Sequence, residues 1–155
     1  MAYNTALQVL VERSRVADVI NTLFLATDER EWDRVRACFA SKVTFDMTSM
    51  AGGTPRQLSA REIVAGWEAG LKPIESIHHQ IGNLAITPLE TTATASCYGT
   101  TYHYRRTRSG RNTRMIVGSY ELNLRLVEGD WRIDLFRFKL KFLDGNVELE
   151  KEPGV

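Results

Sequence analysis

Two adjacent histidines, His78 and His79, are the residues of this sequence best suited to proton-transfer chemistry. They are two of the chain's 3 histidines and lie in the segment IHHQIGN, residues 77–83, where a strand is predicted to begin. Histidine titrates near neutral pH, and a buried imidazole needs a hydrogen-bond partner. Because side chains alternate along a strand, only one of the two can enter a given pocket. The pair is therefore a candidate site, and a hydrogen-bonded strand histidine without a catalytic role is the simpler alternative.

The third histidine, His103, lies on a later predicted strand, 93–107. Residues two apart on a strand share a face. The face of His103 carries mostly small side chains, which would leave room for a ligand: Ala95, Cys97, Gly99, Thr101 and Arg105. The alternative is that Tyr102 and Tyr104 take the buried face and leave His103 in solvent. Only the first arrangement brings His103 to a pocket.

Helices are predicted to precede the strands. Apolar residues recur at spacings of three and four from Ser14 to Thr27, which indicates an amphipathic helix. The segment from Asp28 to Glu31 fits a capping box, and it would start a second helix that carries Trp32, Val35, Arg36 and Phe39. As an N-cap, Asp28 would contribute roughly 1 kcal/mol of stability, and that role alone would explain it.

The remaining pattern predicts one more helix and five strands. A strand at 42–47 is followed by a break at 51–55. The segment 59–62 is a second capping box, and it opens a helix that ends near Gly70 and Pro73 and carries Ile63, Val64, Trp67 and Leu71. Long strands follow at 78–87, 93–107, 113–127 and 131–143. This order predicts an α+β architecture, with N-terminal helices packed on a curved, mostly antiparallel sheet.

Length and charge limit the class of protein. The 155 residues predict a single domain over 1–155, with its core at about 14–143 and with 144–155 as a mobile tail or a lid. A net charge of +1 gives no reason to expect nucleic acid or an anionic membrane as a partner. The arginines around the predicted hairpin tip at 109–110 are interpreted as a solvated turn, with a phosphate site as the alternative: Arg105, Arg106, Arg108, Arg111 and Arg114.

Cysteine usage and motifs limit the cofactors. Cys38 and Cys97 have no paired spacing, which predicts a reduced cytoplasmic protein. No stretch approaches the ~18 apolar residues of a spanning helix, and the N-terminus does not resemble a secretion signal. The sequence contains no glycine-rich phosphate loop, nucleophile elbow or metal-ligand spacing, so we expect no cofactor and no metal.

Four segments together carry a family resemblance. They are ATDEREWDRVRACFA at 26–40, IHHQIGN at 77–83, TYHYRR at 101–106 and GDWRI at 129–133. In this order and spacing the chain, from about 16 to 146, resembles the SnoaL-like branch of the nuclear-transport-factor-2-like family, and within it the scytalone dehydratase-like proteins. The resemblance implies a cystatin-like cone, whose mouth is closed by helices and whose interior holds a small apolar molecule.

The resemblance also implies a set of site residues. In those dehydratases an aspartate after the first helix orients a histidine at the start of a strand, and a second histidine lies on the next strand. The matching positions are Asp28, His79 and His103. The same pair of aspartate and first histidine resembles the dyad of a hexachlorocyclohexane dehydrochlorinase and of bile-acid dehydratases. We expect the pocket to be lined by Phe24, Thr27, Met47, Trp67, Thr101, Tyr120 and Phe138.

Three positions depart from the family pattern. Thr27 and Met47 stand where the dehydratases have tyrosines that help to activate a carbonyl. Leu23 stands where the dehydrochlorinase has a lysine, which argues against dechlorination.

The expected function is that of a cofactor-independent lyase or isomerase, acting on a small apolar cyclic molecule of polyketide, terpenoid or steroid type. His79 would be the base, Asp28 would orient it, and His103 with Tyr120 would donate to the leaving hydroxyl or oxyanion. One alternative is a non-catalytic binding protein of the same fold. Another is an epoxide hydrolase, for which Asp28 and Arg105 are present but no second acid is identified. We expect a homo-oligomer, a trimer or a dimer.

Overall fold

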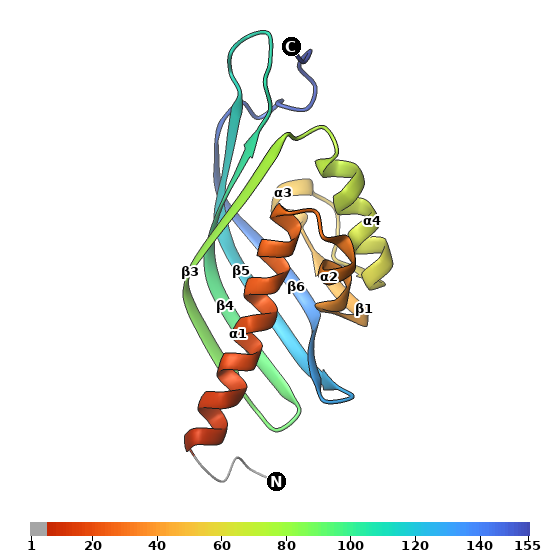
Figure 1. Ribbon diagram of the computed structural model, residues 1–155, viewed down its shortest axis with the longest axis vertical. Coiled ribbons are helices and arrows are strands. Elements are labelled where there is room, and N and C mark those ends of the chain that lie inside the picture. Colours follow the sequence, from red (N-terminus) through yellow and green to blue (C-terminus); the bar gives the residue numbers. More distant parts are fainter. Residues whose placement is uncertain (1–5) are drawn as a thin grey trace.

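The computed structural model describes residues 6–155, which form helices and one six-stranded sheet (Figure 1). The helices are α1 (Ala6–Asp28), α2 (Trp32–Ala37), α3 (Thr48–Ala51) and α4 (Ala60–Leu71). The strands are β1 (Phe39–Asp46), β2 (Arg56–Leu58), β3 (Ser76–Pro88), β4 (Thr92–Tyr104), β5 (Thr113–Val127) and β6 (Asp130–Gly145). Within 6–155, no helix has the length and apolar character needed to span a membrane.

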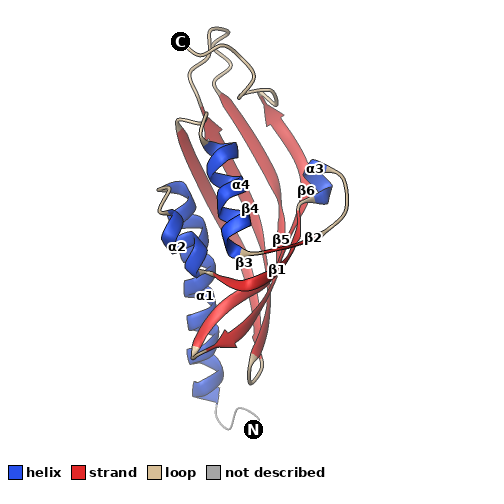
Figure 2. Cartoon of the chain, turned by 90° about the vertical axis from the view of Figure 1, so that its right-hand side faces the viewer, coloured by secondary structure: helices blue, strands red, loops and turns tan. Residues whose placement is uncertain are grey.

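The sheet has the order β2-β1-β6-β5-β4-β3, with β1 and β6 parallel and the other neighbours antiparallel. It is curved and stays open, and α1, α2 and α4 lie on one of its faces (Figure 2). The predicted α+β class is therefore confirmed. Helix α1 runs along β3, which is an edge strand, so the end of α1 lies beside an open row of backbone groups (Figure 1).

The first two helices differ from the sequence prediction. Helix α1 begins at Ala6 rather than near residue 14. The sequence pattern did not predict its first turns because they expose Leu7 and Leu10 and so lack an inward apolar stripe. Asp28 is the last residue of α1, and α2 begins only at Trp32, after an N-cap residue that makes no side-chain cap. The predicted capping box at 28–31 was therefore wrong. Phe39, which was predicted to lie in the second helix, begins β1.

The second capping box is confirmed. The Ser59 hydroxyl accepts a hydrogen bond from the Glu62 N–H at 3.2 Å, and the Glu62 carboxylate accepts one from the Ser59 N–H at 2.8 Å. Helix α4 continues to Leu71, so Gly70 lies within it and does not end it. The four long strands are present with small shifts at their ends, whereas β2, with 3 residues, was too short for its alternation to be detected.

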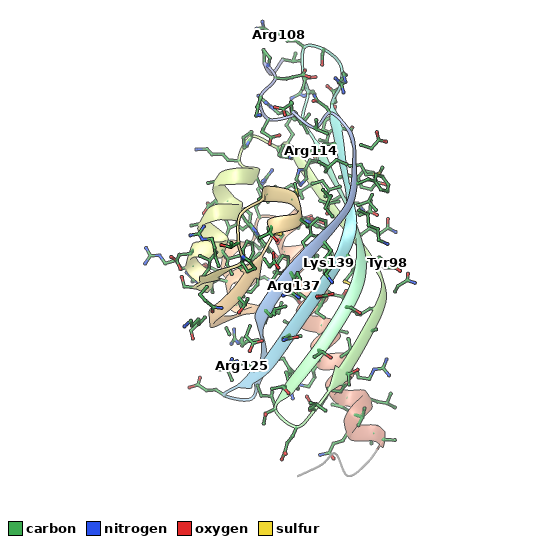
Figure 3. The ribbon with its side chains drawn as sticks, turned by 180° about the vertical axis from the view of Figure 1, so that it is seen from behind. Tyr98, Arg108, Arg114, Arg125, Arg137 and Lys139 are labelled. Carbon is green, nitrogen blue, oxygen red and sulfur yellow. The ribbon has the colours of Figure 1, made fainter. Side chains whose placement is uncertain are left out.

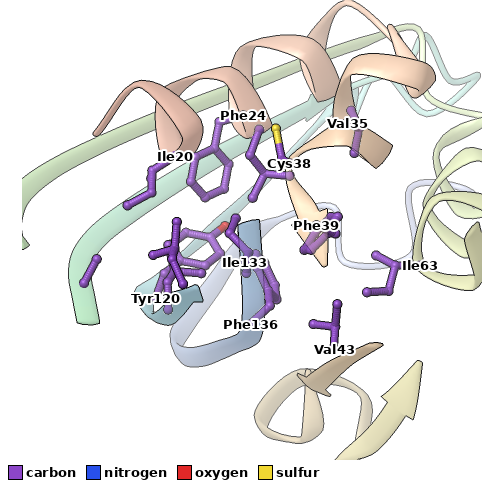
Figure 4. Close-up of a cluster of buried hydrophobic side chains, with 14 of the residues drawn as sticks. Ile20, Phe24, Val35, Cys38, Phe39, Val43, Ile63, Tyr120, Ile133 and Phe136 are labelled. Carbon is purple, nitrogen blue, oxygen red and sulfur yellow. The ribbon is translucent and has the colours of Figure 1, made fainter. Parts of the chain in front are cut away.

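Alternation along β4 decides which side chains face the helices. His103 is 7% exposed on the inner face, whereas Tyr102 and Tyr104 are each 38% exposed on the outer face. The arrangement with His103 in solvent was therefore wrong. The core fills the space between the inner face and the helices (Figure 4), and its fully buried members include Ile20, Leu23, Val35, Val43 and Ile133.

The C-terminal segment, residues 146–155, packs against one end of the sheet. Leu149 is fully buried and packs with Ile74 and Ile77. Arg105 Nη1 donates to three main-chain carbonyl oxygens of the segment, including that of Leu149 at 3.1 Å. The segment is therefore packed against the rest of the domain in this structure, through partners that come from distant parts of the chain, and its role as a tail or a lid stays a prediction.

Candidate active site

Asp28 and His79 form a close pair where the end of α1 meets the edge of β3. Asp28 Oδ1 lies 2.6 Å from His79 Nδ1, and Asp28 Oδ2 accepts a hydrogen bond from the His79 backbone N–H at 2.9 Å. An N–H on the open edge of a sheet has no strand to pair with, and the carboxylate supplies the missing acceptor. Asp28 and His79 therefore meet because α1 ends beside the unpaired edge of β3.

This contact determines the tautomer of His79. An ionised carboxylate only accepts hydrogen bonds, so the neutral His79 ring carries its proton on Nδ1 and a lone pair on Nε2. Both side chains are largely buried, at 14% exposure for His79 and 11% for Asp28. The ring packs against Phe24, with 5.3 Å between the ring centroids. His79 therefore has an Nε2 acceptor available, and a carboxylate that would stabilise its cation.

His103 is held in the opposite way. Arg114 Nη2 lies 3.0 Å from His103 Nδ1, and because a guanidinium only donates, Nδ1 is the acceptor and Nε2 carries the proton. Burial, and next the charge of Arg114, lower the pKa of His103 to about 4, so the ring is neutral near pH 7. In the β3–β4 register His79 is opposite Thr101, two residues from His103 on the same face.

The two histidines open on one cavity of about 230 Å³ between α4, the end of α1 and the inner face of the sheet. Nine of the ten residues predicted for the site line this cavity: His79, His103, Phe24, Thr27, Met47, Trp67, Thr101, Tyr120 and Phe138. Asp28, the tenth, lies behind His79 and contacts its ring. Their catalytic and binding roles stay a prediction.

The sequence analysis missed six lining residues: Met50, Gly66, Gly70, Leu71, Ile116 and Phe136. Met50 belongs to α3, which is only 4 residues long. Ile116 and Phe136 lie at buried positions of strands that the sequence predicted, so the alternation along these strands could have identified them. Gly70 had been considered only as a helix-ending residue and Gly66 had not been considered, because the open side of α4 is visible only in the folded chain.

Aromatic rings form a third of the cavity lining, with Phe24, Trp67, Tyr120, Phe136 and Phe138 among its 15 residues. The Tyr120 ring lies 4.8 Å from that of Phe24, 5.0 Å from that of Phe138 and 5.5 Å from that of Phe136, between centroids. Burial raises the pKa of Tyr120 to about 12, so its hydroxyl remains a donor at neutral pH. Gly99 makes room for this ring, since a Cβ there would lie 2.3 Å from Tyr120 Cε2.

Two other grooves formed by the described residues have a different lining. Grooves of about 480 and 600 Å³ are lined mainly by polar and charged side chains and contain neither His79 nor His103. Residues 6–155 hold no group of three or more histidine, cysteine, aspartate or glutamate side chains placed to bind a metal ion. Cys38 and Cys97 are free, and burial raises the pKa of each thiol to about 11.

Helices covering one face of a curved open sheet, with a cavity between the two layers, are the features of a SnoaL-like domain. The model of the SnoaL-like domain family matches residues 8–137, and the chain belongs to this family. No curated protein matches the sequence.

Solved structures share the fold. A Kribbella flavida protein, Kfla4162, is 19% identical with a TM-score of 0.85 over 91% of this chain and 97% of its own. A Novosphingobium aromaticivorans protein described as a candidate scytalone dehydratase is 15% identical, with a TM-score of 0.73 over 88% of this chain and 89% of its own. A hexachlorocyclohexane dehydrochlorinase, LinA type 2, is 12% identical, with a TM-score of 0.73 over 89% of this chain and 90% of its own.

Proposed function

We propose that the protein is a cofactor-independent lyase of dehydratase type, or an isomerase, that begins by removing a proton from a small apolar cyclic substrate. One observation carries the proposal: two imidazoles face the same cavity with opposite hydrogen-bonding properties. His79 offers a lone pair on Nε2, and His103 offers an N–H on Nε2. A base and a donor in one apolar cavity are what a proton abstraction with charge stabilisation requires.

The proposed chemistry starts at a carbon next to a carbonyl or another activating group. His79 takes the proton, and Asp28 stabilises the resulting imidazolium. His103 donates a hydrogen bond to the oxygen on which negative charge develops. If a hydroxyl leaves from the adjacent carbon, the proton on His79 departs with it as water and the base is restored. If that proton returns to a different carbon, the same residues catalyse an isomerisation.

The walls support the substrate class. Phe24, Trp67, Tyr120, Phe136 and Phe138 present aromatic surface to the cavity, which suits a cyclic apolar molecule of polyketide, terpenoid or steroid type. A dehydratase and a dehydrochlorinase among proteins of this fold support elimination as the reaction class.

We further propose that the protein is a single-domain, cytoplasmic homo-oligomer, a dimer or a trimer. All six strands belong to one sheet, and the free cysteines suit a reducing compartment. The outer face of the sheet exposes Tyr98, Tyr102 and Phe142, which supports self-association through that face.

A non-catalytic binding protein is the second candidate, and the residues at 27 and 47 favour it. Thr27 and Met47 line the cavity without the tyrosine hydroxyls expected of a scytalone dehydratase. Epoxide hydrolysis has less support. Among the described residues the cavity lining includes no carboxylate, and Arg105 is bonded to carbonyls of the C-terminal segment.

The test is turnover of hydroxylated cyclic ketones by the wild type and by His79→Gln. We expect His79→Gln to lose about 10²–10⁴ in kcat/KM, the usual contribution of a positioned base. His78→Gln is the matched control, since His78 is exposed on the opposite face of the same strand. Wild-type turnover in a folded His79→Gln protein would reject the assignment. Binding without turnover in the wild type would favour the second candidate.

A further inference from the structure

A buried arginine, Arg114, joins His103 to the C-terminal segment. Arg114 stands directly opposite His103 in the β4–β5 register, and its Nη2 lies 3.0 Å from His103 Nδ1. Its Nη1 donates to the Glu150 carboxylate at 2.6 Å and to the Val147 carbonyl oxygen at 3.2 Å. The guanidinium thus lies between the cavity histidine and residues 146–155.

The location of Arg114 overturns its interpretation as part of a solvated turn. Arg114 is only 8% exposed, and it lies well back from the hairpin tip marked by Arg108 (Figure 3). Its Nε is a buried nitrogen without a hydrogen-bond partner among the described residues. Burying an arginine with an unpaired N–H is unfavourable for stability, so its placement calls for another explanation.

We propose that Arg114 is a positioning residue that fixes His103 as a neutral ring whose Nε2–H faces the cavity. A guanidinium neither accepts a hydrogen bond nor releases its proton at ordinary pH. Only the tautomer of His103 with a lone pair on Nδ1 can therefore pair with it. Glu150 and the Val147 carbonyl hold the guanidinium in place from the other side. This arrangement mirrors the Asp28–His79 pair, with the donor and acceptor roles exchanged.

The charges around His103 agree with this role. Arg114 acts on it from β5, His79 from β3, Asp28 from the end of α1 and Arg30 from the turn that follows α1. After burial, the charge of Arg114 has the largest effect in lowering the pKa of His103, and Asp28 acts in the opposite direction. Removing Arg114 should therefore both release the tautomer and let His103 become protonated at higher pH.

The catalytic consequence of this inference rests on the proposed function, but its geometry can be tested without turnover. The experiment is NMR of the full chain with ¹⁵N-labelled imidazole rings, since only 3 histidines need assignment. The wild type should show His103 protonated on Nε2 alone, with protonation of Nδ1 only near pH 4. Arg114→Met should show both tautomers and protonation at clearly higher pH. Arg114→Lys keeps the charge with less reach, and it should show a mixture of tautomers.

Arg105→Met is the matched control, because Arg105 holds the carbonyls of the same segment. We expect its His103 signals to match those of the wild type. The proposal is overturned if folded Arg114→Met or Arg114→Lys keeps the wild-type tautomer and titration. It is equally overturned if Arg105→Met changes His103 as much as Arg114→Met does. Loss of turnover in His79→Gln tests the proposed function separately, so the two ideas can fail independently.

Discussion

The carboxylate of Asp28 accepts two hydrogen bonds from His79, one from the ring and one from the backbone. The hydrogen bond to the backbone N–H attaches the end of α1 to the open edge of β3. The hydrogen bond to the ring, made by the other oxygen of the same carboxylate, orients the imidazole. Position and tautomer of the proposed base therefore depend on a single side chain, which makes Asp28 the most informative residue to change.

Asp28→Asn should lower kcat/KM by about 10² or more, within the range for general base catalysis. The two hydrogen bonds reach two different carboxylate oxygens, and asparagine replaces one of these oxygens with an NH₂ group that only donates, so it cannot reproduce the pair of bonds. If the oxygen keeps the backbone N–H, the NH₂ faces Nδ1 and favours the tautomer that lacks a lone pair on Nε2. We expect a loss of roughly 1 kcal/mol in unfolding free energy. Initial rates and urea unfolding measure both effects.

Asp33→Asn is the control for this change. Asp33 is exposed on α2 and pairs with Arg36 at the surface, so kcat/KM should stay at the wild-type level. Normal turnover in Asp28→Asn would show that Asp28 has only a structural role.

The pH dependence of stability should report His103. Its pKa is lowered in the folded state from 6.5 to about 4, so the unfolded chain binds more protons between these pH values. Stability therefore falls as the pH drops from 6.5 towards 4, by roughly 3 kcal/mol for a shift of this size. His103→Gln should flatten this slope, because Gln does not titrate. Chemical unfolding of the wild type and of His103→Gln at a series of pH values measures it.

Gly99→Ala should destabilise the fold by about 1–3 kcal/mol, as overpacking commonly does. A methyl group there would lie 2.3 Å from the Tyr120 ring, which forms part of the cavity wall. Gly82→Ala is the control on the neighbouring strand, since its Cβ would have no atom within 4 Å. Equal thermal stability of the two variants would contradict the observed packing of Tyr120.

Gly70→Leu should weaken ligand binding without loss of stability. Gly70 lines the cavity and is exposed, and a Cβ there would meet nothing within 4 Å. Leucine is a better helix former than glycine by about 0.5–1 kcal/mol, so the melting temperature should be unchanged or higher. We expect ligand affinity to fall about tenfold or more because the side chain would fill the opening. Titration with a hydroxylated cyclic ketone, with Ala69→Leu as the control on the same helix, decides this.

The long strands and α4 were predictable because their signals are local. Alternation over 113–127 reproduced β5, and the reciprocal bonds of Ser59 and Glu62 join residues three apart in the chain. His79 and His103 stood out by residue type, and the family resemblance paired them with Asp28. These features need no knowledge of which distant segments meet.

The partners of the key side chains were decided only by the tertiary structure. The local sequence around Asp28 was equally consistent with an N-cap and with a hydrogen-bond partner of a histidine. The packing of α1 against the edge of β3 directed the Asp28 carboxylate to His79, 51 residues away. Arg114 belonged to a run of arginines typical of a turn, yet strand pairing placed it against His103 and the folded C-terminal segment. A hydrogen bond depends on position in space, and periodicity specifies only which face a residue occupies. The sequence therefore determined the long strands and α4, whereas the tertiary structure decided which face of β4 lies inward and, through the long-range packing of helix, strand edge and C-terminal segment, which tautomers His79 and His103 adopt.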